Sequence, residues 1–240
     1  MKNFISLYDN ALSNEECKFI IDYFENVPPC QGIKEDRKNM SVMRDILQGS
    51  FMCRKPGTII GSDASNQTHV DKNMKDSTDV AMSFTFDDNI LNQILMKSLS
   101  KHTRKYIKEN EELRCISTWG IKDTYNLQRY YPKQGYTYLH CENYNMNSNK
   151  RVLVWMFYLN TVNDDGETYF SNYDLKVNPV EGRLVIWPAY WTHCHKGIVS
   201  NTETKYIATG WFEKIESATI VKKVKKDLLL LYQKKSIKRY

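Results

Sequence analysis

Several features that define other classes of protein are missing from this sequence. No apolar run approaches the roughly 20 residues that a membrane-spanning helix needs, and the N-terminus lacks the apolar stretch of a signal peptide. The six cysteines show no C-x-x-C spacing that would indicate a metal or redox motif. We therefore expect a soluble, cytoplasmic protein whose cysteines are reduced thiols.

A strong excess of charge is also missing. The chain carries 34 basic and 28 acidic residues, and much of the net charge of +6 lies in residues 221–240. The rest of the chain is near neutral and contains no nucleic-acid-binding motif. A basic pI alone is a weak argument for a nucleic-acid partner.

Apolar residues, by contrast, are plentiful enough for a packed core. Hydrophobic residues make up 41% of the 240 residues and aromatic residues 12%, so a folded protein is expected. The length suits a single domain spanning residues 1–240. Within it we expect a helical and loop-rich support region at residues 1–114, a β-rich core at 115–212 and a basic helix at 213–240.

Three segments have the pattern of helices. Ser13 and Glu16 form a capping-box signature at the start of residues 13–24, and apolar residues recur with helical spacing over residues 89–110. Residues 30–80 are polar and irregular, which predicts long loops with short strands. The segment from about residue 217 is basic and amphipathic, and it either packs on the body or binds a membrane surface or partner.

Short segments rich in β-branched and aromatic residues dominate the sequence after residue 115. The predicted strands are residues 4–7, 81–86, 115–121, 125–131, 136–142, 151–159, 167–170, 175–177, 183–187, 193–196 and 205–212. Many short strands separated by turn signals predict a sandwich or barrel. The expected fold class is therefore mainly β with flanking helices, within the α+β class.

A histidine and a carboxylate two residues apart, His140 and Glu142, are the first candidates for chemistry. In a strand, alternate side chains project from one face, so both could reach one metal ion. Downstream, His195 is the better candidate for the third ligand and His193 is the alternative. The sequence allows either one, because both side chains share a face if the segment is extended. Lys205 follows at the start of an apolar run, where a buried cation would need a carboxylate partner.

Two metal chemistries fit this cluster. Two histidines and one carboxylate on one side of an ion form the facial triad of non-haem Fe(II) oxygenases, which leaves positions open for other ligands. His140, His193 and His195, with Glu142 as ligand or base, would also suit a zinc hydrolase or a zinc-binding protein. A zinc site gives no role to Lys205, so the iron site is the favoured interpretation.

A series of motifs surrounds these residues in a fixed order. They are Tyr131-Pro132 before His140-x-Glu142, Tyr158-Leu159-Asn160, Asp165-Gly166-Glu167-Thr168-Tyr169-Phe170, Gly182-Arg183-Leu184 through Pro188, and His195-Lys196-Gly197 with Lys205. As a set, they resemble the 2-oxoglutarate- and Fe(II)-dependent dioxygenases of the prolyl 4-hydroxylase-like branch. The resemblance covers roughly residues 115–212. It departs from the family pattern at Glu142, where Asp is usual, and at Asp165, which replaces a Gly.

This resemblance implies a double-stranded β-helix (jelly-roll) core and a set of site residues. It assigns His140, Glu142 and His195 to Fe(II), and it assigns Lys205 to the distal carboxylate of 2-oxoglutarate. The tyrosines implied as further contacts to the cosubstrate are Tyr158, at the Y-L-N motif, and either Tyr130 or Tyr131. Trp211 falls either near the floor of the pocket or in the core.

The resemblance also implies an activity. We expect hydroxylation of a C–H bond in a prolyl or other peptidyl substrate, or in a small molecule, with release of succinate and CO2 and with ascorbate as an accessory reductant. Residues 30–80 could form the lid that selects the substrate. A non-catalytic jelly-roll binding module is the remaining alternative, and the complete triad with Lys205 argues against it.

Overall fold

The computed structural model describes residues 2–30, 53–60, 68–85 and 89–215. The helices in these ranges are α1 (Asn14–Asn26) and α3 (Ile90–Glu109), with short 3-10 turns η1 (Glu111–Cys115), η2 (Ser171–Tyr173) and η3 (Trp191–His193). The strands are β1 (Ser6–Tyr8), β2 (Lys55–Pro56), β3 (Ile59–Ile60), β4 (Thr68–His69), β5 (Thr78–Ser83), β6 (Trp119–Tyr130), β7 (Arg151–Tyr158), β8 (Thr168–Phe170), β9 (Leu175–Val177), β10 (Leu184–Pro188), β11 (His195–Gly197) and β12 (Lys205–Lys214).

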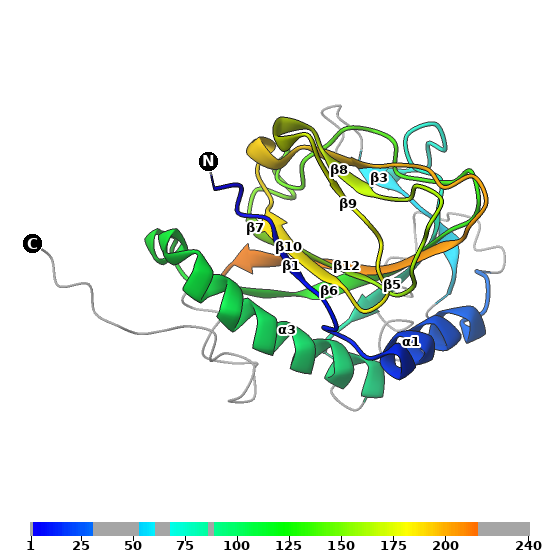
Figure 1. Cartoon of the computed structure of the whole chain (residues 1–240), viewed down its shortest axis with the longest axis horizontal. Coiled ribbons are helices and arrows are strands. Elements are labelled where there is room, and N and C mark those ends of the chain that lie inside the picture. The colour runs from blue at the N-terminus through cyan, green and yellow to red at the C-terminus, as the bar shows by residue number, and fades with distance from the viewer. Residues whose placement is uncertain (1, 31–52, 61–67, 86–88, 216–240) are drawn as a thin grey trace, which may run out of the picture.

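Two antiparallel sheets face each other and form the body of the molecule. The larger sheet has the strand order β1-β10-β7-β12-β6-β5-β2, and the smaller sheet has the order β11-β8-β9. Helices α1 and α3 lie along the face of the larger sheet that points away from the smaller one (Figure 1). This arrangement confirms the predicted mainly β fold with flanking helices.

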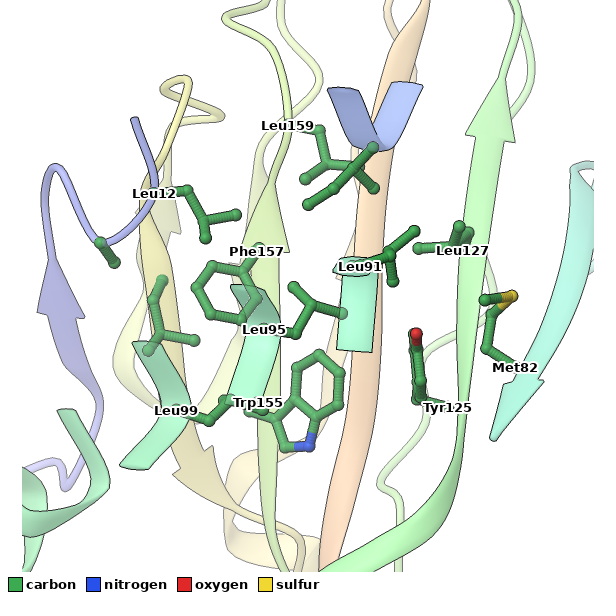
Figure 2. Packing of buried hydrophobic residues seen from close by; sticks show 14 of the residues in the cluster. Leu12, Met82, Leu91, Leu95, Leu99, Tyr125, Leu127, Trp155, Phe157 and Leu159 are labelled. Carbon is green, nitrogen blue, oxygen red and sulfur yellow. The ribbon is translucent and has the colours of Figure 1, made fainter. Parts of the chain in front are cut away.

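Strand β7 separates two hydrophobic cores, because all eight of its residues are buried. Trp155 and Phe157 project toward α3 and pack in one cluster with Leu91, Leu95 and Leu99 (Figure 2). The alternate residues of β7 project between the two sheets and join a second cluster; they are Val154, Met156 and Tyr158. The period-2 alternation of a strand thus supplies a core on each side of one sheet.

Both described helices begin where the sequence predicts. The Ser13 hydroxyl accepts a hydrogen bond from Glu16 N (3.2 Å), and Glu16 Oε2 accepts one from Ser13 N (2.9 Å), so the capping box is formed. Helix α3 is capped by the Asn89 side chain, which accepts from Leu91 N (2.9 Å). Each helix buries its apolar stripe against the larger sheet.

Some of the predicted strand boundaries are wrong. Residues 115–121 and 125–131 were expected as separate strands, but the single strand β6 runs from Trp119 to Tyr130 and Cys115 ends a 3-10 turn. His193 also lies in a 3-10 turn, so the strand begins only at His195.

The predicted strand at residues 136–142 is not formed as a continuous ladder. Its backbone bonds to three different segments in turn: Thr137 N donates to Met74 O (2.9 Å), His140 pairs with His195, and Glu142 N donates to Ala189 O (3.0 Å). A strand needs one partner over several residues. Here only isolated bridges remain, and they lie at the positions that carry the candidate site.

The expectation that all six cysteines are thiols is wrong for one pair. Cys30 and Cys53 are joined by a disulfide across a sequence separation of 23 residues. The backbone of residues 28–30 pairs with Arg54, with Arg54 N donating to Pro28 O (2.8 Å) and Cys30 N to Arg54 O (3.0 Å), and this brings the two Cα atoms to 4.9 Å. Such long-range pairing cannot be inferred from cysteine spacing.

The predicted basic helix at residues 213–240 lies outside the described part of the chain except for its first three residues, and Glu213 and Lys214 still belong to β12. Much of the predicted loop region at residues 30–80 also lies outside the described part. None of the helices in the described ranges combines the length and the apolar character that crossing a membrane requires.

Candidate metal centre

His140, Glu142 and His195 come together at one point between the two sheets. Each offers one ligand atom, and the three atoms all lie within 4.8 Å of one another. Glu142 Oε1 is 3.6 Å from His140 Nε2 and 3.7 Å from His195 Nε2. The three residues are brought together by the backbone pairing of His140 with His195 and by the bond of Glu142 N to Ala189 O.

Both imidazole rings are oriented by a backbone carbonyl. His140 Nδ1 lies 2.8 Å from Tyr138 O, and His195 Nδ1 lies 2.9 Å from His193 O. A carbonyl only accepts hydrogen bonds, so each Nδ1 carries the proton and each Nε2 presents a lone pair toward Glu142. Metal-binding histidines are commonly fixed in this way.

The two oxygens of Glu142 have different partners. Oε2 accepts hydrogen bonds from Arg151 Nη1 (2.8 Å) and Trp211 Nε1 (2.9 Å), while Oε1 faces the two histidines. Burial opposes ionisation of this carboxyl, but the neighbouring His140 and the Arg151 charge hold the pKa of Glu142 well below its ordinary value. Glu142 is therefore an anion that offers one free oxygen.

The environment of His195 keeps its ring neutral. Burial, together with the neighbouring His140, lowers the pKa of His195 to about 4. His140 in turn stacks on Tyr136, with ring centroids 3.9 Å apart and an interplanar angle of 14°. Two neutral imidazoles and one carboxylate are the donors that a divalent transition-metal ion takes in a facial arrangement.

His193, the alternative third ligand, lies away from this cluster. Its Nε2 is 2.7 Å from Asn3 O and its Nδ1 is 2.9 Å from Thr192 Oγ1. Burial lowers its pKa. Because η3 replaces the extended segment expected around it, His193 does not share a face with His195.

Lys205 points into the same cavity as the three candidate ligands. Its Nζ donates to Gly166 O (2.9 Å) and lies 5.2 Å from the centre of the Tyr130 ring. Burial lowers the pKa of Lys205 to about 8, and the charge of Glu167 opposes that shift. Within the described ranges no carboxylate forms an ion pair with Lys205, so a buried cation faces the cavity and suits an acidic ligand.

The turn before β8 supplies the carbonyl that Lys205 binds. Asp165 and Gly166 both have positive φ angles, of 56° and 80°. An added Cβ at Gly166 would lie 2.9 Å from Val162 Cγ1, so the second of these positions requires glycine. Asp165, which departs from the family pattern, adopts the left-handed conformation that Asp tolerates better than most residues.

The tyrosines named from the sequence lie in three different environments. Tyr130 lines the cavity, and its hydroxyl donates to Gln128 Oε1 (2.9 Å). Tyr131 is 47% exposed and lies against the Arg129 guanidinium. Tyr158 is fully buried outside the cavity lining, where its hydroxyl contacts Thr168 Oγ1 (2.7 Å); Thr168 itself lines the cavity.

Several cavity residues were not found from the sequence. Lys75 forms a buried ion pair with Asp79 (2.7 Å), and Asp79 also accepts from Gln128 Nε2 (3.0 Å). Lys75 lies in the segment read as irregular loop, where nothing in the sequence indicates burial. Arg151 is the first residue of β7; the sequence suggests a surface residue at the start of a strand, so only its position opposite Glu142 reveals its role.

The cavity has a volume of about 260 Å³, which suits a small acid beside a metal ion. It is lined by Thr58, Lys75, Asn126, Gln128, Tyr130, Tyr136, His140, Glu142, Tyr144, Arg151, Met156, Thr168, Trp187, His195, Gly197, Lys205, Ile207, Thr209 and Trp211. The donor set fits Fe(II), and the buried Lys205 ammonium fits one carboxylate of 2-oxoglutarate.

Comparison with known proteins finds a family model that matches part of the chain. Residues 125–213 match the model of the 2OG-Fe(II) oxygenase superfamily. This segment runs from the middle of β6 to the end of β12 and contains all three candidate metal ligands and Lys205. The matched segment is therefore a 2OG-Fe(II) oxygenase domain, an enzyme domain whose cofactors are Fe(II) and 2-oxoglutarate.

Solved structures confirm the jelly-roll fold. A viral collagen prolyl hydroxylase from Paramecium Bursaria Chlorella virus-1, in complex with 2OG, shares 18% identity with a TM-score of 0.52, over 88% of this chain and 97% of that one. A prolyl-4-hydroxylase from Pseudomonas putida shares 14% identity with a TM-score of 0.56, over 90% of this chain and 95% of that one. A prolyl hydroxylase from Trichoplax adhaerens, in complex with a peptide fragment of the hypoxia inducible factor oxygen degradation domain, shares 15% identity with a TM-score of 0.55, over 89% and 84%. No curated protein sequence matches this chain.

Proposed function

We propose that this oxygenase hydroxylates a prolyl residue, or another residue, in a peptide or protein substrate, with Fe(II) held by His140, Glu142 and His195. The fixed position of the Glu142 carboxylate supports this assignment most directly. Glu142 Oε2 is occupied by Arg151 and Trp211, and Oε1 is left facing two oriented Nε2 atoms. Glutamate is one methylene longer than the aspartate usual in the family, and these two donors hold the longer side chain in place.

The proposed cosubstrate site lies around Lys205. Its ammonium would bind the distal carboxylate of 2-oxoglutarate through a charge-assisted hydrogen bond. Tyr130 and Thr168 line the same cavity and offer hydroxyl groups, while Tyr158 acts through its contact with Thr168. Burial of Lys205 strengthens the attraction, because the surrounding medium screens charge less than water does.

The side chains of this protein hold and orient the metal ion and the cosubstrate, and these bound groups supply the oxidation. When bound, Fe(II) and 2-oxoglutarate supply the chemistry that places one oxygen atom on the substrate carbon and converts the cosubstrate to succinate and CO2. Tyr136 fixes the His140 ring by stacking, and burial keeps His195 neutral so that its Nε2 lone pair stays available. Holding the reactants at fixed distances accounts for much of the acceleration expected of such a site.

A peptidyl substrate is supported by the fold relatives, which are named as prolyl hydroxylases; one of them is bound to a peptide. A zinc hydrolase built on this His/Glu cluster would have no use for a buried Lys205 that forms no ion pair with a carboxylate among the described residues. A non-catalytic binding module would need neither the three metal ligands nor Lys205. Small-molecule substrates remain the competing class for the oxygenase itself.

An anaerobic titration tests the site before any substrate is known. Addition of Fe(II) and then 2-oxoglutarate to the metal-free full chain should give a weak visible charge-transfer band. His140→Ala should abolish the band and Lys205→Ala should weaken it. Tight binding of Zn(II) with no band in the unmodified protein would rule out the iron site.

A turnover assay tests the substrate class. Proline-containing peptides are incubated with enzyme, Fe(II), 2-oxoglutarate, ascorbate and O2, and succinate and peptide mass are followed. Mass gain at proline that requires His195 supports the proposal. Succinate release that no peptide stimulates, and that a small acid or amine does stimulate, would move the substrate to the small-molecule class.

A further inference from the structure

A cysteine lies beside the candidate ligands on each of the two segments that meet at the metal centre. Cys141 stands between His140 and Glu142, and Cys194 directly precedes His195. His140 and His195 exchange both backbone hydrogen bonds, with N–O distances of 3.0 and 2.8 Å. In an antiparallel pair, the residues next to such a pair face each other directly with Cα atoms only about 4.5 Å apart. Cys141 and Cys194 occupy those positions.

The two thiols lie on the side of the bridge opposite the imidazoles, because successive residues of an extended chain point to opposite faces. Both cysteines are free and partly exposed. The thiols of Cys141 and Cys194 lie within hydrogen-bonding reach of each other, and each donates its proton to a nearby carbonyl, Cys141 to Asn143 O (3.6 Å) and Cys194 to Trp191 O (3.1 Å). The metal centre uses neither thiol.

This placement meets the geometric requirement for a disulfide. Disulfides join Cα atoms roughly 4.4–6.8 Å apart, a range that includes the spacing of directly facing residues in such a pair. The remaining free cysteines do not have such a neighbour: Cys17 is buried in α1, and Cys115 is exposed at the end of η1. The facing pair also combines partial exposure, which lets a small oxidant reach it, with a fixed backbone.

We propose that Cys141 and Cys194 form a redox modification site that takes a small-molecule disulfide as its oxidant and closes to an intramolecular disulfide behind the metal centre. One thiolate attacks the small disulfide, forms a mixed disulfide and releases one small thiolate. The second protein thiolate then attacks the protein sulfur of the mixed disulfide and releases the other small thiolate. The two protein thiols are oxidised, the small disulfide is reduced to two thiols, and the two protons pass to these products.

The test uses the full chain and hydroxyethyl disulfide as the probe. After reaction, remaining thiols are alkylated and peptides are mapped by mass spectrometry without reduction. The unmodified protein should yield a linked Cys141–Cys194 peptide pair that dithiothreitol reverses, while Cys115 yields only a mixed disulfide. In Cys194→Ser, Cys141 should stop at the mixed disulfide, and Cys141→Ser should trap Cys194 in the same way.

Two outcomes would overturn the proposal. Mixed disulfides at both positions without a link would show that the thiols do not reach each other, and reaction at Cys115 alone would show that the pair is closed to the probe. The melting temperature gives an independent readout, because a link between residues 141 and 194 restricts the unfolded chain. Oxidation should raise Tm by several degrees in the unmodified protein and leave Cys194→Ser unchanged. A linked product with a lowered Tm would mean that the link needs a distorted structure, and this too would overturn the proposal.

Discussion

At the scale of single residues, the carboxylate of Glu142 shows how neighbours decide what a ligand can do. Arg151 lies 3.8 Å above the Trp211 ring, and both donate to the same oxygen. The pair therefore acts as a rigid clamp that turns a flexible glutamate into a ligand with one free oxygen. Without the clamp, Glu142 could rotate and offer either oxygen or neither.

Removing one donor of the clamp should weaken metal binding. Residues that orient metal ligands typically contribute a factor of about 10–100 to metal affinity, so Arg151→Gln and Trp211→Phe should each raise the Kd for Mn(II) or Co(II) by about this factor. Isothermal titration with either metal measures the effect. The matched control is Lys122→Gln: Lys122 lies 5.6 Å from the Trp211 ring and pairs with Glu213, but it makes no contact with Glu142. An equal loss in the control would contradict the clamp.

Lys205 should control cosubstrate affinity and contribute little to the fold. Its substitution by Met removes a hydrogen bond to a charged group worth about 1.5–3 kcal/mol, which is about 10- to 100-fold in the Kd for 2-oxoglutarate. Because the ammonium is buried with no carboxylate partner among the described residues, Tm of the ligand-free protein should stay the same or rise. Lys176→Met, on the exposed face of β9, is the control and should leave the Kd unchanged. A large drop in Tm for Lys205→Met would indicate a structural role instead.

The affinity for 2-oxoglutarate should also depend on pH through Lys205. The protonated amine binds the carboxylate, and burial lowers its pKa to about 8 in the ligand-free protein. Binding is therefore at full strength below pH 8; above it, the amine must take up a proton on binding, and affinity should fall by up to about tenfold per pH unit. Calorimetric titrations between pH 7 and 10 measure this. A Kd that stays constant to pH 10 would mean that Lys205 does not contact the ligand.

At the scale of elements, local signals predicted the regular parts well. The capping box at Ser13 and the apolar spacing of α3 gave both helices within a few residues, since helix ends are determined by short-range hydrogen bonds and periodicity. Strands β7 to β10 and β12 were likewise visible as β-branched and aromatic runs between turns.

What the sequence did not predict depends on partners far away in the chain. Residues 136–142 alternate as a strand does, yet they bond in turn to the segments around Met74, His195 and Ala189. The Cys30–Cys53 disulfide and the buried Lys75–Asp79 pair also come from long-range pairing. The sequence favoured His195 as the third ligand, but no local signal indicated the 3-10 turn that removes His193 from the face of His195.

Strand β12 contains a glycine that the packing of the helical core requires. Gly210 lies opposite Trp155, and an added Cβ would overlap the indole ring. Gly210→Ala should therefore lower the free energy of unfolding by about 1–3 kcal/mol, the usual effect of overpacking. Urea denaturation with an unchanged m-value measures this, and no change in the urea midpoint would show that Trp155 can move aside.

At the scale of the whole molecule, the metal centre joins segments that lie far apart in the chain. The stretch from Tyr136 to Asn143 pairs only through isolated bridges. Ligands that bind only the folded state stabilise it by mass action, by about 2.7 kcal/mol at 100 times the Kd. Adding Mn(II) with 2-oxoglutarate should thus raise Tm by roughly 5–10 °C.

Differential scanning fluorimetry measures that shift, and a chelator should reverse it. Glu142→Ala supplies the control, since it removes the free carboxylate oxygen while leaving both imidazoles. A shift of the same size in this variant would place the stabilising ion at some other site.

Strand β7 separates the hydrophobic cluster under α3 from the cavity that contains the metal ligands, and this has a consequence for how the substrate range of such an enzyme can evolve. Trp155 and Phe157 belong to the compartment packed by α3, while Met156 lines the cavity beside the metal ligands. A close-packed interior passes on added or lost volume instead of absorbing it. The size of the group that the cavity admits is therefore determined in part by residues under α3 that never contact a ligand. Substitutions on the α3 side of β7 can thus change the substrate range.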